Sequence, residues 1–318
     1  MLTRRHIRVK VFQTLYAMSQ TGSEDLTKAE KFLENASQAY EDLHLMMLAI
    51  FVELRKKEIE FQNLYKNSHL KADDFEKKLT QKFIENQAIT LIESSKKFQD
   101  KLEKRHIRVW KDNDMAVLEL LKNMKDSAIY DKYISSSTSS VATDTKFLKE
   151  LFEQIIAPSE KLFDFLTDQN IYCADDYPLI NTLILKSLNK LEEAAVYRFS
   201  DLYKDEEDAL FGKKLLHKTA LNQKTLQAFY EGKTHNWEFD RISIIDITLL
   251  NMALAEFCYF SSIPTKVTIN EYVEISKEYS TKNSSLFING LLDFLLKNPE
   301  TNIKFQKTGR GLISTSNK

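Results

Sequence analysis

ISIIDITLLNMALAEFCYF, residues 242–260, is the stretch that decides the fold class. It is mostly apolar around the whole helical circumference, with Asp246, Asn251 and Glu256 as isolated polar positions. These interruptions exclude a membrane span, and a helix that is apolar on all sides belongs in a protein core. We therefore expect a central core helix here. Periodicity alone does not distinguish Asp246 from an ordinary solvent-facing charge.

The composition extends the helical interpretation to the whole chain. Average usage predicts about 22 glycines and about 16 prolines for this length, whereas the 318 residues include only six and four. So few turn-forming residues disfavour sandwiches, propellers and barrels, and the spacing of the glycines excludes GxGxxG and GxxxxGK loops. The sequence predicts an all-α protein.

Local signals mark several helices on either side of the core stretch. Residues 5–20 form an apolar stripe that Gly22 should end, and the acidic run at 205–208 is typical of a helix start. Residues 27–66 predict one long packed helix, with a coiled-coil dimer seam as the alternative.

Two further signals lie near the C-terminal end. Thr268 and Glu271 have the spacing of a capping box that would open a helix. Gly290 lies inside a predicted last helix, where glycine costs about 1 kcal/mol relative to alanine. A close helix crossing is our structural explanation for this glycine.

Charge is balanced overall but not at the N-terminus. The chain has 45 basic and 46 acidic residues, which excludes a globally basic coat for nucleic acid. The first 20 residues, however, hold Arg4, Arg5, Arg8 and Lys10 and no acidic residue. Arginines at a helix start oppose the helix dipole by about 0.3 to 1 kcal/mol each, so a fold gains nothing from them. An anionic polymer would offset this cost, which predicts RNA binding with Tyr16 able to stack on bases; a solvated terminus is the alternative.

Enzyme and metal chemistry have little support. The two cysteines stand far apart without CxxC spacing, and the six histidines occur in unrelated contexts without a nucleophile elbow. We therefore expect no catalytic residues, no metal and no cofactor. The N-terminus lacks the apolar stretch of a signal peptide, and the absence of a membrane span agrees with a reducing, cytoplasmic address.

The pentapeptide RHIRV occurs twice, at 5–9 and at 105–109. The flanking residues do not match, so the sequence does not indicate a duplication. Either Arg105 and Arg108 form a second RNA contact or the match is coincidental. We favour coincidence.

Longer motifs at the two ends resemble a known family. RRHIRVKVFQTLYA at 4–17 is similar to the opening of the NusB family of bacterial transcription antitermination factors. FDRISIIDITLLNMALAEF at 239–257, IPTKVTINEYVEISKEYS at 263–280 and LFINGLLD at 286–293 resemble its C-terminal half. The length resembles that of the long Bacteroidetes versions.

The resemblance implies a NusB-like helical bundle with a large helical insertion. Residues 1–20 and 200–298 would form a discontinuous RNA-binding core, and residues 21–199 an insertion to which the sequence assigns no role. Residues 299–318 would form a flexible basic tail. Family members have no active site.

The resemblance also implies partners and a site. Family members pair with the ribosomal protein NusE, bind the boxA element of single-stranded ribosomal RNA leaders, and join an antitermination complex on RNA polymerase. The predicted RNA-binding residues are Arg4, Arg5, Arg8, Lys10, Tyr16 and Phe287.

Two alternatives belong to other functional classes. A helical scaffold that has lost specific RNA binding would use the insertion to hold a protein partner. An RNA cytosine methyltransferase with a NusB-like domain would need a glycine-rich cofactor-binding sheet after the helices, and only about twenty residues follow the last predicted helix. We therefore expect the adaptor and not the methyltransferase.

Overall fold

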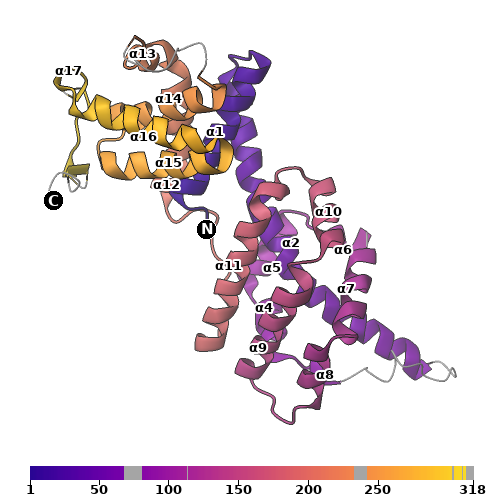
Figure 1. Ribbon diagram of the computed structural model, residues 1–318. Helices are drawn as coiled ribbons and strands as arrows, with labels where there is room; N and C mark the ends of the chain where they lie inside the picture. The colour runs from indigo at the N-terminus through magenta and orange to yellow at the C-terminus, as the bar shows by residue number, and fades with distance from the viewer. Residues whose placement is uncertain (68–80, 113, 233–241, 303, 310, 313–318) are drawn as a thin grey trace. The chain divides into compact units, whose positions relative to one another are not determined.

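The structure is a computed structural model that describes residues 1–67, 81–112, 114–232, 242–302, 304–309 and 311–312. Within these ranges the regular elements are helices, and no β-strand is present. Figure 1 shows these helices in chain order. The prediction of an all-α protein is confirmed.

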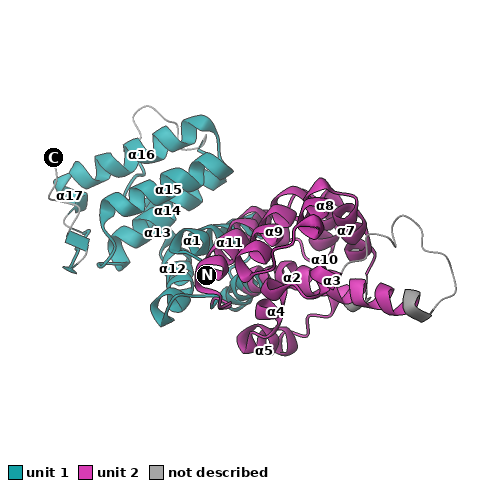
Figure 2. Ribbon diagram, turned by 90° about the horizontal axis from the view of Figure 1, so that it is seen from below, with its two compact units in different colours: residues 1–37, 201–318 teal, residues 38–200 magenta. Residues whose placement is uncertain are grey.

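The chain forms two compact units, each of which is described by itself. Unit 1 comprises residues 1–37 and 201–318, and unit 2 comprises residues 38–200 (Figure 2). Segments from the two ends of the sequence therefore share unit 1. Helix α2 (Leu26–Asn67) contributes residues to both units.

Unit 1 is built around the helices at the C-terminal end. Helix α1 packs against α12 and α14, and α14 also contacts α15 and α16. Figure 1 shows the indigo α1 next to these orange helices, although some two hundred residues separate them in sequence. The helices are α1 (Arg4–Thr21), the first part of α2, α12 (Glu206–Leu221), α13 (Gln223–Gln227), α14 (Ile244–Tyr259), α15 (Thr265–Tyr279), α16 (Lys282–Lys297) and α17 (Pro299–Asn302).

Helix α14 is the centre of unit 1, as its apolar sequence predicts. Ser243 caps its start, where the hydroxyl accepts a hydrogen bond from the Asp246 backbone N–H at 3.1 Å. Side chains on all of its faces are fully buried: Leu249, Leu250, Met252, Leu254 and Phe257. The predicted core helix over 242–260 is therefore confirmed, with helical residues from 244 to 259. Residues 239–241 of the quoted motif lie outside the described residues.

The isolated polar residues of α14 are hydrogen-bonded inside the unit. Asp246 accepts hydrogen bonds from the hydroxyls of Ser280 at 2.8 Å and Ser284 at 2.9 Å. Asn251 accepts one from the Tyr230 hydroxyl at 3.0 Å. Asp246 is therefore a buried acceptor that connects α14 to α16, and its interpretation as a solvent-facing charge is wrong.

Helix ends follow some of the local signals. Gly22 ends α1 with φ at 62°, the left-handed conformation that glycine favours, and α12 begins within the acidic run, as predicted. The predicted capping box at Thr268 and Glu271 is wrong. Helix α15 begins at Thr265, because the fixed φ of Pro264 sets the helix start directly after it, so both residues lie inside the helix.

The close helix crossing lies at a different glycine from the one predicted. A Cβ atom at Gly290 would meet no atom within 4 Å, so the explanation by close packing is wrong there. At Gly212 of α12, a Cβ atom would lie 2.8 Å from Cγ2 of Ile7 on α1. This glycine lets α1 and α12 approach each other.

The described part of residues 299–318, for which a flexible basic tail is predicted, packs against unit 1 through Phe305. Phe305 is 5% exposed, and its ring lies 5.3 Å from Phe229 and 5.1 Å from Phe257, measured between centroids. Burying an aromatic ring stabilises a segment by about 1.5 to 3 kcal/mol. The composition of the segment did not indicate that Phe305 would be buried. Residues 303, 310 and 313–318 lie outside the described residues.

Unit 2 packs around the long helix α2. The alternating apolar residues of α2 that predicted a packed helix include Leu43, Met47, Ile50 and Leu54, which the chain itself buries completely. The packed-helix interpretation is confirmed for the part of α2 that contains these residues, whereas Leu64 is 63% exposed. The other elements are α3 (Gln81–Ile84), α4 (Gln87–Glu93), α5 (Lys96–Lys104), α6 (Val109–Asp112), α7 (Met115–Lys125), α8 (Ala128–Ser135), α9 (Val141–Leu151), a π-helical turn (Phe152–Ile156), α10 (Glu160–Gln169) and α11 (Cys173–Ala194).

Candidate nucleic-acid interface

Helix α1 begins with a reciprocal cap between Thr3 and His6. The Thr3 hydroxyl accepts a hydrogen bond from the His6 backbone N–H at 3.5 Å, and His6 Nδ1 accepts one from the Thr3 backbone N–H at 3.4 Å. Burial lowers the pKa of His6 to about 4, helped by the positive charges of Lys10, the N-terminus and Arg5. The His6 ring is therefore neutral at pH 7.

Arg4 pairs with the acidic start of α12. Its Nε lies 2.6 Å from Asp208 Oδ1, and its Nη2 lies 2.7 Å from Glu207 Oε1. Asp205 caps α12 by accepting a hydrogen bond from the Asp208 backbone N–H at 2.9 Å. The acidic run thus both starts a helix, as predicted, and neutralises an arginine of α1, which no local pattern indicated.

Arg5 is the most exposed of the three arginines, with 43% of its side chain accessible. It binds Glu271 of α15 with two hydrogen bonds, from Nε to Oε2 at 2.9 Å and from Nη2 to Oε1 at 3.0 Å. These hydrogen bonds outweigh partial burial and raise the pKa of Arg5 above its ordinary value. A bidentate pair of this kind also fixes the plane of the guanidinium.

Arg8 is buried, with 3% of its side chain accessible, and it pairs with Glu256 of α14, which is fully buried. Its Nε lies 2.5 Å from Glu256 Oε1, and its Nη2 lies 3.0 Å from Oε2. Burial alone would lower the pKa of Arg8, but the adjacent Glu256 carboxylate reverses this and raises it. The guanidinium also lies over the Phe211 ring, 5.1 Å from its centroid.

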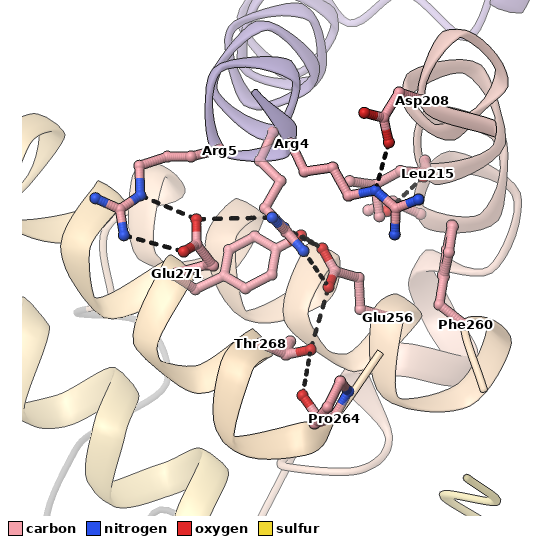
Figure 3. A network of polar contacts seen from close by, with 12 residues as sticks. Arg4, Arg5, Asp208, Leu215, Glu256, Phe260, Pro264, Thr268 and Glu271 are labelled. Carbon is pink, nitrogen blue, oxygen red and sulfur yellow. Dashed lines mark hydrogen bonds and ion pairs between the residues drawn. The ribbon is translucent and has the colours of Figure 1, made fainter. Parts of the chain in front are cut away.

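Glu256 is the centre of a polar network that joins α1, α14 and α15 (Figure 3). It accepts hydrogen bonds from the Tyr272 hydroxyl at 2.8 Å and the Thr268 hydroxyl at 3.1 Å, in addition to those from Arg8. Glu271 Oε2 lies 3.6 Å from Arg8 Nη1 and so links Arg5 to the same network. Breaking a buried pair of this kind costs about 3 to 5 kcal/mol.

Each arginine predicted to bind RNA is thus matched by a carboxylate from a distant segment. The argument that a fold gains nothing from these arginines is wrong, because Asp208, Glu256 and Glu271 offset the unfavourable helix dipole. Sequence reasoning missed these partners. The sequence did indicate that Glu256 would have a partner, since an acidic side chain in a core helix is almost always paired.

Of the other three predicted RNA-binding residues, two are buried. Lys10 is 4% exposed and Phe287 is 9% exposed. Tyr16 is half-buried near the end of α1, with its ring centroid 6.1 Å from that of Phe12. The structure therefore gathers the three arginines in one network and places Tyr16 two to three turns along the same helix. RNA contacts by all six residues stay a prediction.

A pocket of about 670 Å³ opens beside the arginines. The start of α1, the turn at 262–264 and the first turns of α15 line it. The lining has an apolar part, formed by Ile263, Pro264 and Val267, and a charged part that includes Arg4, Arg5 and Glu271. Val267 is 44% exposed although it is apolar.

The described C-terminal residues hold the turn that lines this pocket. The Lys307 ammonium donates hydrogen bonds to the carbonyl oxygens of Glu256 and Phe260, both at 3.0 Å. The Thr308 backbone N–H donates to the Ser261 carbonyl oxygen at 3.0 Å. Carbonyl groups at a helix end attract cations, so Lys307 stabilises both the end of α14 and the turn after it. Burial lowers the pKa of Lys307 to about 8.

The second copy of RHIRV lies in unit 2 and has a different conformation. It follows the last turn of α5, where His106 adopts a left-handed φ of 52°. Arg105 forms two 2.6 Å contacts with the Asp42 carboxylate, and Arg108 is exposed. The two copies therefore do not form a structural repeat.

Comparison with known proteins identifies the C-terminal part of the chain. Residues 175–297 match the model of the NusB family. Those residues are a NusB family domain. They include Asp208, Glu256 and Glu271, which bind the three arginines of α1, whereas α1 itself lies outside the matched range.

Curated NusB proteins are similar to about a third of the chain or less. The similarity to the transcription antitermination protein NusB of Salinibacter ruber is 39% identity over 103 residues, which is 32% of this chain and 64% of that protein. With NusB of Chloroherpeton thalassium it is 38% over 100 residues, 31% of this chain and 47% of that protein. With NusB of Natranaerobius thermophilus it is 39% over 79 residues, 25% of this chain and 57% of that protein.

The chain thus spans about half to two thirds of the length of these relatives. No solved structure matches it. In the part of the chain that the structure describes, no helix is long and apolar enough to cross a membrane. The same residues contain no cluster of three or more histidine, cysteine or acidic side chains that could hold a metal ion.

Proposed function

We propose that this protein is a non-catalytic RNA-binding adaptor in transcription antitermination. In this proposal it binds boxA-like single-stranded leader RNA together with the ribosomal protein NusE and joins the antitermination complex on RNA polymerase in the cytoplasm. The curated relatives carry the name transcription antitermination protein NusB. The boxA element and the two protein partners come from the family resemblance.

One observation carries the proposal. The arginine-rich helix α1 is bound to the NusB family domain by Glu256 and Glu271, which lie in the matched range. A basic segment is thereby fixed on the surface of a domain whose named relatives act in antitermination. Charge on the N-terminal segment and family similarity on the C-terminal segment thus support the same RNA surface.

Burial divides the proposed RNA-binding residues into two groups. Arg4 and Arg5 have side chains that are 31% and 43% accessible, so we propose that they contact RNA directly. Arg8 is buried against Glu256, and we propose that it acts by holding α1 on the domain. Lys10, Tyr16 and Phe287 stay candidates for weaker contacts.

The test is fluorescence anisotropy with a labelled boxA-like RNA, with and without NusE from the same organism, over a salt series. We expect NusE to raise the affinity and Arg4→Ala/Arg5→Ala to weaken binding by about tenfold or more, which is about 1.4 kcal/mol. Arg105→Ala/Arg108→Ala is the matched control, because it removes the same two charges from the second pentapeptide. Equal loss in both variants would mean that only net charge matters.

A helical scaffold without specific RNA binding is the second candidate. It is favoured by the carboxylate that faces each arginine of α1, since a neutralised cation attracts phosphate less strongly. The same titrations separate the two candidates. Pairing with NusE without RNA binding at any salt concentration would establish the scaffold and exclude the adaptor.

A further inference from the structure

We propose that the pocket beside α1 receives the base of one unpaired nucleotide of the bound RNA. This inference rests on the proposed function and adds a ligand site to it. The residues that would contact the base are Arg5, His6, Ile263, Pro264 and Val267. Unpaired bases can leave the base stack and pack on planar or apolar side chains without the cost of breaking a base pair.

The pocket is large enough to hold a base, and its lining suits one. Its volume of about 670 Å³ is in the range of small-molecule sites, which are concave and mostly apolar with a few polar groups. Val267 and Pro264 provide accessible apolar surface. The His6 ring adds a flat surface that its hydrogen bond with Thr3 orients and that carries no charge at pH 7.

The arginine geometry favours a base over a phosphate or an acidic peptide. Arg5 directs Nε and Nη2 at Glu271, so part of its in-plane hydrogen-bonding capacity is already used. The Glu271 carboxylate, which also lines the pocket, repels a second anion. A base needs only the face of the Arg5 guanidinium for stacking. The bidentate pair with Glu271 fixes the orientation of that face before RNA binds.

The apolar part of the pocket is fixed in advance as well. The turn at 262–264 follows Ser261, whose carbonyl oxygen accepts the Thr308 backbone N–H, and a Cβ atom on Gly311 would overlap this same oxygen. Lys307 holds the preceding helix end through two carbonyl oxygens. A preformed pocket loses less conformational entropy when it binds.

Abasic scanning tests the inference on the full-length protein. The boxA-like RNA is synthesised as a series in which one nucleotide at a time lacks its base, and each is titrated against the wild type. We expect one position at which loss of the base weakens binding by roughly 5- to 150-fold, the range for one stacked base. The same series is then measured with Arg5→Lys, which keeps the charge but removes the plane, and with Val267→Asn at the exposed apolar position.

We expect the loss of affinity caused by the missing base at this position to shrink to near onefold in both variants. The salt dependence of RNA binding should stay unchanged in Arg5→Lys. Arg105→Lys and Leu221→Asn are matched controls, because they make the same changes in unit 2 and at another exposed apolar residue of unit 1. A series without a position-specific penalty, or a penalty equal in wild type and variants, would overturn the pocket while leaving the adaptor intact. Absence of binding to the complete RNA would overturn both.

Discussion

The pentapeptide RHIRV has two structures in this protein. At residues 5–9 it lies inside helix α1, with Arg8 buried against Glu256 of α14. At residues 105–109 it follows the end of helix α5, with Arg108 exposed. The difference shows that five identical residues do not determine conformation, burial or role.

The flanking residues set the local conformation. Thr3 precedes the first copy and caps a helix that continues through an apolar stripe. The second copy ends a helix: the backbone N–H of His106 binds the Glu103 carbonyl oxygen at 3.0 Å, and that of Ile107 binds the Leu102 carbonyl oxygen at 3.1 Å. This bonding pattern is a Schellman motif, with His106 at the left-handed position that usually holds glycine.

The largest expected difference between the copies lies in their second arginines. Arg8→Met should lower the free energy of unfolding by about 3 to 5 kcal/mol, because it leaves the Glu256 carboxylate buried without its cation. Arg108→Met should change it by no more than about 0.5 kcal/mol, because the side chain is exposed. Urea unfolding followed by circular dichroism measures both.

The double variant Arg8→Met/Glu256→Gln serves as the control for this mechanism. Glutamine removes the buried charge and keeps one acceptor oxygen, which can serve the Tyr272 or the Thr268 hydroxyl, so part of the lost stability should return. If Arg8→Met and Arg108→Met unfolded at the same urea concentration, the buried pair would contribute nothing to the difference between the copies.

The two isoleucines should differ next. Ile7 is 3% exposed and lies at the close crossing of α1 and α12, so Ile7→Ala should cost about 2 to 5 kcal/mol. Ile107 is only half-buried, and Ile107→Ala should cost less than half as much. The same urea titrations compare them, and equal losses would contradict the difference in burial.

The two histidines should give the smallest effects, with opposite signs. His6→Gly should destabilise the protein by about 1 kcal/mol or more, because glycine is a poor helix former and the cap on Thr3 is lost. His106→Gly should stabilise it by up to about 1 kcal/mol, because glycine adopts a φ of 52° without strain. Differential scanning calorimetry gives the two shifts in melting temperature, and shifts of equal sign would contradict the assigned backbone conformations.

Structural features that depend on contiguous residues could be predicted from the sequence. The apolar helix over 242–260, the end of α1 at Gly22 and the acidic start of α12 each depend on a short run of sequence. The capping box at Thr268 failed because Pro264, four residues earlier, already sets the start of α15. The explanation of Gly290 failed because a glycine at a close crossing and an exposed glycine look alike in sequence.

The candidate site was predictable only in its chemistry. The cluster of arginines at the start of α1 was visible, whereas the pairing of Arg4 with Asp208 and of Arg8 with Glu256 joins residues 204 and 248 positions apart. The pocket likewise combines α1 with residues 262–271. Lys307 and Phe305 come from a segment whose composition predicted flexibility.

The sequence by itself determined that the protein is helical, that its N-terminus is basic and that its C-terminal part resembles the NusB family. These properties depend on composition and on short runs of sequence. They do not depend on the distances between residues that are far apart in the chain. Only the tertiary structure decided which arginines are buried, which carboxylates neutralise them and where a pocket opens. Pair energies and burial depend on the separation of atoms in space, and a one-dimensional pattern does not contain that separation for residues two hundred positions apart.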